Sequence, residues 1–247
     1  MDTAYAHSYG DLEEEHWWFR ARRRILEDTI ARLDWPLRPR IMEIGVGSGL
    51  NLYTLYPAGA EMLGIEPNAD NAARARARGP VAVHVATVES LPSEITDASL
   101  DGITMFDVLE HTKDDLVSLR AVRQKLKPRG LLVLTVPAYM WLWGQQDDIS
   151  HHYRRYTRSE LCARLREAGF VIRRSTYFNT FLFPPIAAFR VMARGMRRAD
   201  ARMDTDFKYS VGFANHVLYL AFAAETCALR VMNFPFGVSV LAVAEKS

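Results

Sequence analysis

The sequence predicts an α/β fold, a doubly wound and mostly parallel sheet with helices on both faces. Short apolar runs alternate with helical stretches from residue 40 to residue 178, which is the order of strands joined by crossover helices. The chain has 247 residues, of which 49% are hydrophobic and 24% charged, so it can form one full-sized core and is unlike a disordered or fibrous protein.

The expected strands are residues 40–45, 61–66, 81–85, 100–107, 131–136 and 170–178, with a closing strand at 237–246. The expected helices are residues 11–33, 51–59, 68–79, 116–130, 157–170, 181–195 and 216–232. Most of the helices between strands end at or near a glycine, as helices commonly do.

The last third of the chain interrupts this alternation. Two helical segments flank the basic, polar stretch Met196–Tyr209, and only then does the closing strand follow. We expect a C-terminal helical insertion before the last strand, which either forms a lid over a substrate or packs as two helices on the sheet.

Composition excludes several classes of protein. Lys and Arg number 31 against 29 Asp and Glu, and a net charge of +2 does not indicate a nucleic-acid partner. The only cysteines, Cys162 and Cys227, are far apart, which excludes a disulfide scaffold and fits a reducing compartment. The acidic, aromatic N-terminus is unlike a secretory signal, and charges interrupt the late apolar stretch. We expect a cytoplasmic monomer or homodimer with no transmembrane segment.

A glycine-rich turn follows the first strand, with Gly45, Gly47 and Gly49 at alternate positions. Glycines there permit a tight turn and close approach of a ligand, at the crevice where doubly wound sheets bind ligands. Dinucleotide-binding turns space their glycines differently. Glu43, two residues before the turn, is a poor neighbour for a pyrophosphate but suits a sulfonium cation. The pattern therefore favours S-adenosylmethionine, and the alternative is a turn with no ligand.

Glu66 ends the second strand, about 20 residues beyond the first glycine, where an acidic residue can accept hydrogen bonds from both ribose hydroxyls. The alternative is an acid that stabilises the start of the next helix through the helix dipole.

These motifs resemble those of class I S-adenosylmethionine-dependent methyltransferases. The resemblance covers about residues 40–175 and rests on MEIGVGSG, LGIEPN, ATVESLP, LDGITMFDVLEHTKD, LKPRGLLVLTVPA and RSELCARLREAGFVI. It implies a Rossmann-like, seven-stranded sheet whose last strand is antiparallel. The implied division is an N-terminal helical cap (1–36), a cofactor-binding core (37–178), the helical insertion (179–235) and the last strand (236–247), all within one domain.

The resemblance also implies which residues bind the cofactor. They are Glu43, Gly45, Gly47 and Gly49 around the methionine part, Glu66 and Pro67 at the ribose, Thr87 and Val88 beside the adenine, and Asp107 after the fourth strand. Thr87 departs from the family pattern, which has Asp there, so the side-chain contact to adenine is an open question; Glu89 is a candidate replacement.

His111 follows the fourth strand and is a candidate general base, since imidazole titrates near neutral pH. The alternative is a histidine that hydrogen-bonds at the start of a helix. The spacing of Asp107, Glu110 and His111 also resembles quinone-ring O-methyltransferases, in which a divalent metal is implied. We assign no metal and leave this alternative open.

The long segment 137–157 resembles a bacterial branch of the family through its Asp-x4-His-x-Arg-Arg-Tyr pattern. Members of that branch act on glycans, lipids or secondary metabolites. We expect His152 and Tyr156 to be catalytic, and Tyr139 and Arg155 to bind the substrate. The alternative is that Arg154 and Arg155 form ion pairs that hold the loop.

Trp18 lies in an N-terminal aromatic cluster, HWWF, that also resembles this branch. We expect it to roof the cleft and contact substrate, although such aromatics can equally pack as core.

Two clusters of arginines stand near apolar segments: Arg20, Arg22, Arg23 and Arg24, and then Arg190, Arg194, Arg197 and Arg198. They are compatible with peripheral contact to an anionic membrane, although a solvated helix face is the preferred interpretation.

The expected function is transfer of the methyl group of S-adenosylmethionine, by in-line displacement, to an oxygen or nitrogen of a small-molecule, glycan or lipid-linked acceptor. Two alternatives are a non-methylating rearrangement that uses the sulfonium charge and a non-catalytic cofactor-binding subunit.

Overall fold

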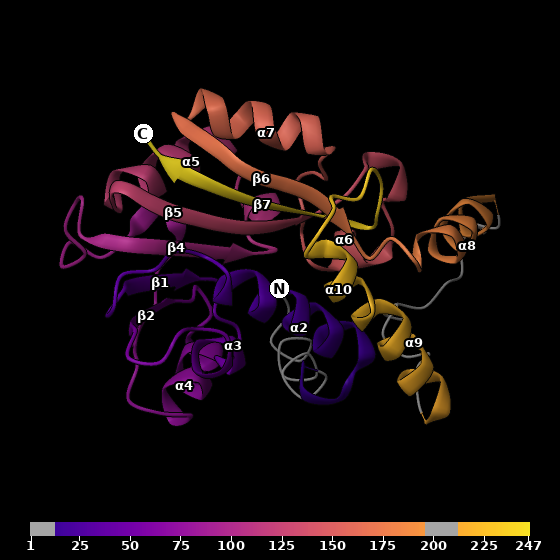
Figure 1. The fold of residues 1–247 in the computed structure, drawn as a ribbon, viewed down its shortest axis with the longest axis horizontal. Coiled ribbons are helices and arrows are strands. Elements are labelled where there is room, and N and C mark those ends of the chain that lie inside the picture. Colours follow the sequence, from indigo (N-terminus) through magenta and orange to yellow (C-terminus); the bar gives the residue numbers. More distant parts are fainter. Residues whose placement is uncertain (1–12, 196–211) are drawn as a thin grey trace.

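The computed structural model describes residues 13–195 and 212–247, which contain a seven-stranded sheet of order β3-β2-β1-β4-β5-β7-β6 (Figure 1). Strand β7 runs antiparallel to both β5 and β6, whereas the other pairs are parallel. The strands are β1 (Arg40–Ile44), β2 (Glu61–Ile65), β3 (Ala82–His84), β4 (Leu100–Phe106), β5 (Leu126–Pro137), β6 (Phe170–Phe178) and β7 (Ser239–Lys246). The predicted fold class, including the antiparallel last strand, is confirmed.

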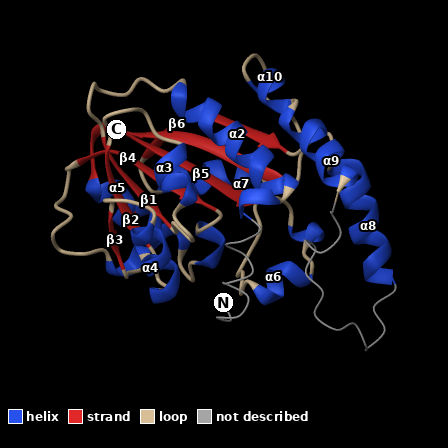
Figure 2. Cartoon of the chain, turned by 90° about the horizontal axis from the view of Figure 1, so that it is seen from below, coloured by secondary structure: helices blue, strands red, loops and turns tan. Residues whose placement is uncertain are grey.

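Helices cover both faces of this sheet. The helices are α2 (Trp17–Ala31), α3 (Leu50–Thr54), α4 (Ala69–Ala77), α5 (Asp115–Lys125), α6 (Gln145–Ile149), α7 (Arg158–Glu167), α8 (Phe183–Gly195), α9 (Phe213–Ala223) and α10 (Glu225–Leu229). Helices α5 and α7 pack together on one face, and α2 packs against α9 and α10 on the other (Figures 1 and 2). Within the described ranges, no helix has both the length and the apolar character needed to cross a bilayer.

Three predicted helices differ from the structure. The helix expected at 116–130 ends at Lys125, and the residues around Pro128 open β5 instead, because proline lacks the N–H that a helix interior needs. The helix expected at 216–232 is divided at Ala224 into α9 and α10. The helix expected from residue 11 to residue 33 is interrupted at His16, which is the N-cap of α2; residues 11 and 12 and the stretch Met196–Tyr209 lie outside the described residues.

The carboxyl ends of β1, β2, β4, β5 and β6 lie along one edge of the sheet. The pairing places Ile44 beside both Ile65 and Met105, and Ser239 at the start of β7 beside both Pro137 and Phe178. Segments that leave these strands therefore meet at this edge, although they are far apart in the sequence. Ligands of open α/β sheets bind at such an edge.

Gly49 caps α3 in the left-handed region, at φ +85°, and a Cβ there would lie 2.7 Å from the Cα of Ala75 in α4. We expect Gly49→Ala to lower the free energy of unfolding by about 3 kcal/mol, because left-handed strain adds to overpacking against backbone. Gly59 is the matched control, since its φ is +83° but open space surrounds it. Gly59→Ala should cost only about 1 kcal/mol. Urea unfolding measures both, and equal losses would contradict the packing role.

Candidate active site

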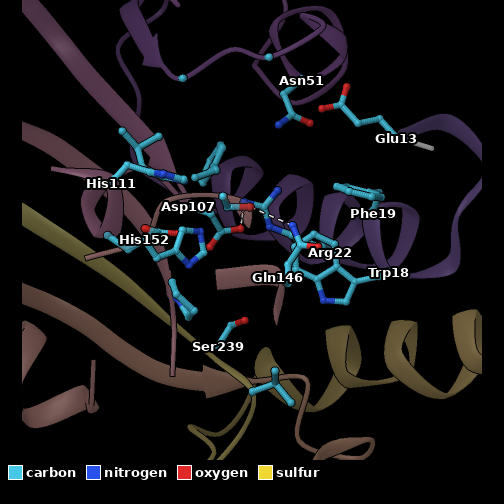
Figure 3. Close-up of a pocket in the computed structure, with 18 of the residues that line it drawn as sticks. Glu13, Trp18, Phe19, Arg22, Asn51, Asp107, His111, Gln146, His152 and Ser239 are labelled. Atoms are coloured by element: carbon cyan, nitrogen blue, oxygen red, sulfur yellow. Dashed lines mark hydrogen bonds and ion pairs between the residues drawn. The ribbon is translucent and has the colours of Figure 1, made fainter. Parts of the chain in front are cut away.

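A cavity of about 920 Å³ opens at this edge of the sheet, between α2 and the ends of β1, β2 and β4 to β6 (Figure 3). Its volume lies near the upper end of the about 300–1,000 Å³ that is typical of small-molecule sites. The predicted site residues that line it are Trp18, Gly45, Gly47, Glu66, Pro67, Thr87, Val88, Asp107, His111, His152 and Arg155. One cavity therefore brings together segments from most of the chain.

The turn after β1 and the acid after β2 are bonded to each other. Gly47, at φ +54°, donates its backbone N–H to one oxygen of Glu66 at 2.9 Å, and Asn68 donates to the other at 3.0 Å. Burial raises the pKa of Glu66, which is only 6% exposed. At Gly45 a Cβ would lie 2.5 Å from Cγ2 of Val108. The turn thus fixes a carboxylate at the cavity wall where a ribose acid is expected.

Glu43 does not line the cavity, and its predicted part in cofactor binding stays a prediction. All four residues from Ile41 to Ile44 are buried, and Glu43 points into the protein, where its oxygens accept from Tyr56 at 2.7 Å and Asn51 at 3.4 Å. Burial raises its pKa to about 8. Asn51 does line the cavity. Glu43 is therefore connected to the cavity through Asn51, a residue that the sequence analysis missed.

Gly49 also lies outside the cavity lining, where it permits close packing of α3 on α4, and its role in binding stays a prediction. Glu13, which the sequence analysis also missed, lies over the turn with its carboxylate hydrogen-bonded to the hydroxyl of Ser48. No local pattern in the sequence marks this long-range contact.

Thr87, Val88 and Glu89 form one wall of the cavity. Thr87 begins a short 3-10 helix (Val88–Ser90), and its backbone N–H donates to the hydroxyl of Ser90 at 3.2 Å. A carboxylate oxygen of Glu89 accepts from Ser118 at 3.2 Å. This wall therefore offers the apolar side chain of Val88 and short polar groups to a flat ring.

Asp107, directly after β4, forms an ion pair with Arg22 of α2. Nη2 of Arg22 lies 2.6 Å from Oδ2 of Asp107, and Thr135 donates to the other carboxylate oxygen at 3.2 Å. The Arg22 guanidinium also lies over the ring of Trp18, at 5.1 Å from its centroid. Arg22 is thus buried in the site rather than on a solvated helix face. It contacts both Trp18 of α2 and Asp107 at the end of β4 (Figure 3).

The side chains of Glu110, His111 and His152 lie close together, beside Asp107. The two imidazole rings meet edge to face, with centroids 4.5 Å apart. Burial lowers the pKa of His111 to about 4, with a further contribution from His152, so this ring is neutral at neutral pH. Glu110 is fully buried, and neither of its carboxylate oxygens has a hydrogen-bond partner within the described chain. Burial, together with Asp107, raises the pKa of Glu110 well above its usual range.

Asp147 orients His152. Its Oδ1 lies 2.8 Å from Nδ1 of His152 and accepts from Nε of Arg155 at 2.8 Å. Burial alone would raise the pKa of Asp147, but these hydrogen bonds and the Arg155 charge lower it to about 2. The pairing leaves Nε2 of His152 as the nitrogen that can take up a proton.

Arg155 lines the cavity, but its guanidinium is bonded to Asp147 and to the carbonyl of Ala138 at 3.1 Å. Arg154 pairs with Asp115 at 3.2 Å. These contacts are the ion pairs of the alternative interpretation, in which the arginines hold the loop.

Tyr156 and Tyr139 lie outside the cavity lining, and their predicted catalytic and substrate-binding roles stay predictions. Tyr156 follows Arg155 in extended backbone and points the opposite way, where its hydroxyl donates to Asp115 at 3.0 Å. Tyr139 stacks on Tyr177, with ring centroids 5.2 Å apart.

Known proteins are similar to this chain in sequence and in fold. A family model described as a methyltransferase domain matches residues 18–175. A probable S-adenosylmethionine-dependent methyltransferase of Mycobacterium tuberculosis is 27% identical over 164 residues, which cover 65% of this chain and 58% of that protein. The ubiquinone biosynthesis O-methyltransferase of Xanthomonas axonopodis is 32% identical over 162 residues, 58% of this chain and 67% of that protein. The match thus spans less than two thirds of the mycobacterial relative.

A solved complex of the Haloferax volcanii Trm112 methyltransferase activator and its methyltransferase has a similar fold, with a TM-score of 0.63 at 18% identity over 98% of this chain and 96% of that one. The seven-stranded sheet and the glycine turn joined to an acidic residue define an enzyme that binds a nucleoside-containing cofactor. The chain belongs to the class I S-adenosylmethionine-dependent methyltransferases.

The cluster Glu110, His111 and His152 could also hold a metal ion, since one ligand atom from each residue lies within 4.8 Å of the others. A carboxylate and two imidazoles suit Zn²⁺. The sequence analysis considered Asp107 as a metal ligand beside Glu110 and His111. In the structure Asp107 is paired with Arg22, and His152 is the third residue of the cluster.

We expect Zn²⁺ to bind this cluster and to inhibit methyl transfer, because the ion occupies both imidazoles. Loss of a group that merely supports a metal ligand costs about 10–100-fold in affinity, so Glu110→Gln, which removes a ligand, should raise the Kd for Zn²⁺ at least as much. Competition with a fluorescent zinc indicator measures this. His151→Asn is the control, because His151 is exposed and not part of the cluster. Equal affinities in the wild type and Glu110→Gln would contradict the assignment.

Proposed function

We propose that the enzyme methylates a hydroxyl oxygen of a small molecule with a large apolar portion. The observation that carries this proposal is an apolar wall of the cavity. It is formed by apolar side chains from α8 and the residue before it, from α9 and from the segment before β7: Leu182, Pro185, Ile186, Phe189, Leu218 and Val238. An apolar acceptor gains free energy from burial against such a wall, whereas a glycan would lose hydration there.

The half of the cavity at the ends of β1 and β2 would hold S-adenosylmethionine. Glu66 would accept hydrogen bonds from the ribose hydroxyls, Val88 would pack on the adenine, and the open turn at Gly45 and Gly47 would admit the methionine part. When bound, the cofactor supplies a methyl group activated by the sulfonium charge. The ion pair between Asp107 and Arg22 closes the cavity beside the histidines and limits the access of water.

His152 is the proposed general base. As the acceptor oxygen forms its bond to the methyl carbon and the carbon–sulfur bond breaks, the hydroxyl proton passes to Nε2 of His152. Asp147 stabilises the imidazolium that forms, and Arg155 holds Asp147 in place. Neutral His111 packs against the His152 ring without adding charge. Because this arrangement removes a proton, it favours a hydroxyl over an unprotonated amine.

The relative from Xanthomonas axonopodis supports oxygen as the accepting atom, since it is named an O-methyltransferase of ubiquinone biosynthesis. The histidine pair of this chain therefore fits methylation of an oxygen, and its apolar wall fits an apolar acceptor.

Methyl-labelled cofactor tests the proposal with two matched acceptors, catechol and a catechol that carries a decyl chain. Each buried methylene is worth about 0.8 kcal/mol, so we expect kcat/KM to be higher for the decyl compound by several orders of magnitude. Ile186→Ser should reduce this preference and leave catechol itself unaffected. Equal rates for the two catechols, or label transferred only to a sugar or an amine, would contradict the proposed acceptor.

A further inference from the structure

Asn179 is a buried polar residue of the cavity that neither the sequence motifs nor the proposed chemistry uses. It directly follows β6, lines the cavity and is 0% exposed. Neither its carboxamide oxygen nor its carboxamide nitrogen has a hydrogen-bond partner within the described residues. A buried polar group left without a partner costs about 1–3 kcal/mol. A bound molecule that satisfies both atoms would recover this free energy.

The backbone holds the Asn179 side chain in place. Its φ is +56°, in the left-handed region, which asparagine tolerates better than most residues. Its carbonyl accepts from Val238 at 3.3 Å, and the next residue, Thr180, donates its hydroxyl to Phe236 at 2.6 Å. Glu225, at the start of α10, accepts from the backbone of Phe181 at 2.7 Å. The carboxamide is therefore carried by a clamped segment at the edge of the sheet.

The sheet order fixes how far Asn179 lies from the reacting groups. Asp107 and Glu110 follow β4, and β5 and β7 stand between β4 and β6. Neighbouring strands are about 4.8 Å apart, so the ends of β4 and β6 are separated by roughly 14 Å. Ser239 of β7 lies between these two strand ends and lines the cavity, as the apolar wall does. A single elongated molecule can reach both ends.

We infer that Asn179 binds the far end of the methyl acceptor, and that this end carries both a hydrogen-bond donor and an acceptor, as a carboxamide or a carboxylic acid does. A carboxamide side chain offers one acceptor oxygen and two donor hydrogens, so its complement needs both kinds of group. The inference rests on the proposed function and refines it. The acceptor has a hydroxyl beside His152, an apolar middle, and a polar end at Asn179.

Two series of catechols test this inference, with chains from hexyl to dodecyl that end in a methyl group or in a carboxamide. Calorimetry measures binding to the enzyme loaded with S-adenosylhomocysteine, independently of catalysis. Asn179→Gly removes the side chain without strain, because glycine adopts a positive φ freely. We expect this variant to bind the best carboxamide compound about 10–100-fold more weakly, with binding of the methyl-terminated compound unchanged.

Asn179→Asp is the second variant, since aspartate keeps the shape and the acceptor oxygens but loses the donor hydrogens. We expect it to weaken carboxamide binding, because the carbonyl oxygen of the carboxamide loses its donor, and to leave binding of the methyl-terminated compound unchanged. Equal losses for both chain endings in Asn179→Gly, or no wild-type preference for the carboxamide at any length, would overturn the inference and leave the proposed function standing. If the wild type methylates neither series, the proposed function fails and the inference fails with it.

Discussion

Replacement of His152 by glutamine is expected to lower kcat by about 10²–10⁴-fold, the usual contribution of a general base. Glutamine retains a polar side chain of similar reach but cannot take up the proton of the acceptor. The affinity for S-adenosylhomocysteine should stay unchanged, because the cofactor half of the cavity lies at the ends of β1 and β2. Single-turnover transfer of a labelled methyl group measures the rate, and calorimetry measures the affinity.

Asp147→Asn should lower kcat in the same direction, since it removes the charge that stabilises imidazolium at His152. The control is His151→Asn: His151 is the neighbouring histidine, is exposed and has a φ of +55°, which asparagine tolerates. A rate for His152→Gln close to that of the wild type would contradict the role of His152. The mechanism would then need no base, as for an acceptor that is already deprotonated.

The sequence was sufficient for the fold and for the position of the glycine-rich turn, because those signals are local. Apolar runs marked every strand, and Gly45, Gly47 and Glu66 all line the cavity. The same local pattern could not say which way single side chains point. Glu43 lies in a strand that is buried on both faces. Its neighbours therefore show no alternation of apolar and polar residues that would indicate which face of the sheet each side chain lies on.

Contacts between distant segments could not be predicted. Arg22 belongs to a run of arginines that is typical of a solvated helix, yet it pairs with Asp107 after β4. Arg155 and Tyr156 are adjacent in the sequence, and only the extended backbone sends one toward the cavity and the other toward Asp115. Asn179 stands among aromatic residues with no motif, and its importance depends on burial and on the absence of partners among the described residues.

Glu66→Ala is expected to raise the Kd for S-adenosylhomocysteine by about 100-fold or more, because hydrogen bonds to a charged group are worth about 1.5–3 kcal/mol each and two ribose hydroxyls lose their acceptor. Glu66→Gln is the matched variant and should lose less, since its amide oxygen can still accept one hydrogen bond. Calorimetric titration of both variants measures the effect. Unchanged affinity in Glu66→Ala would remove the ribose assignment.

The pH dependence separates this role from a purely structural one. Burial raises the pKa of Glu66, and protonation adds one O–H donor and reduces the capacity of the carboxyl group to accept hydrogen bonds. Because the ribose hydroxyls bind the ionised form, occupancy of the site should lower this pKa and release a proton. The affinity of the wild type should therefore fall as the pH is lowered toward the raised pKa, and Glu66→Gln should show no such fall. If Glu66 served only to hold Gly47 and Asn68, its pKa would not respond to the ligand, and the wild type and Glu66→Gln would show the same pH profile.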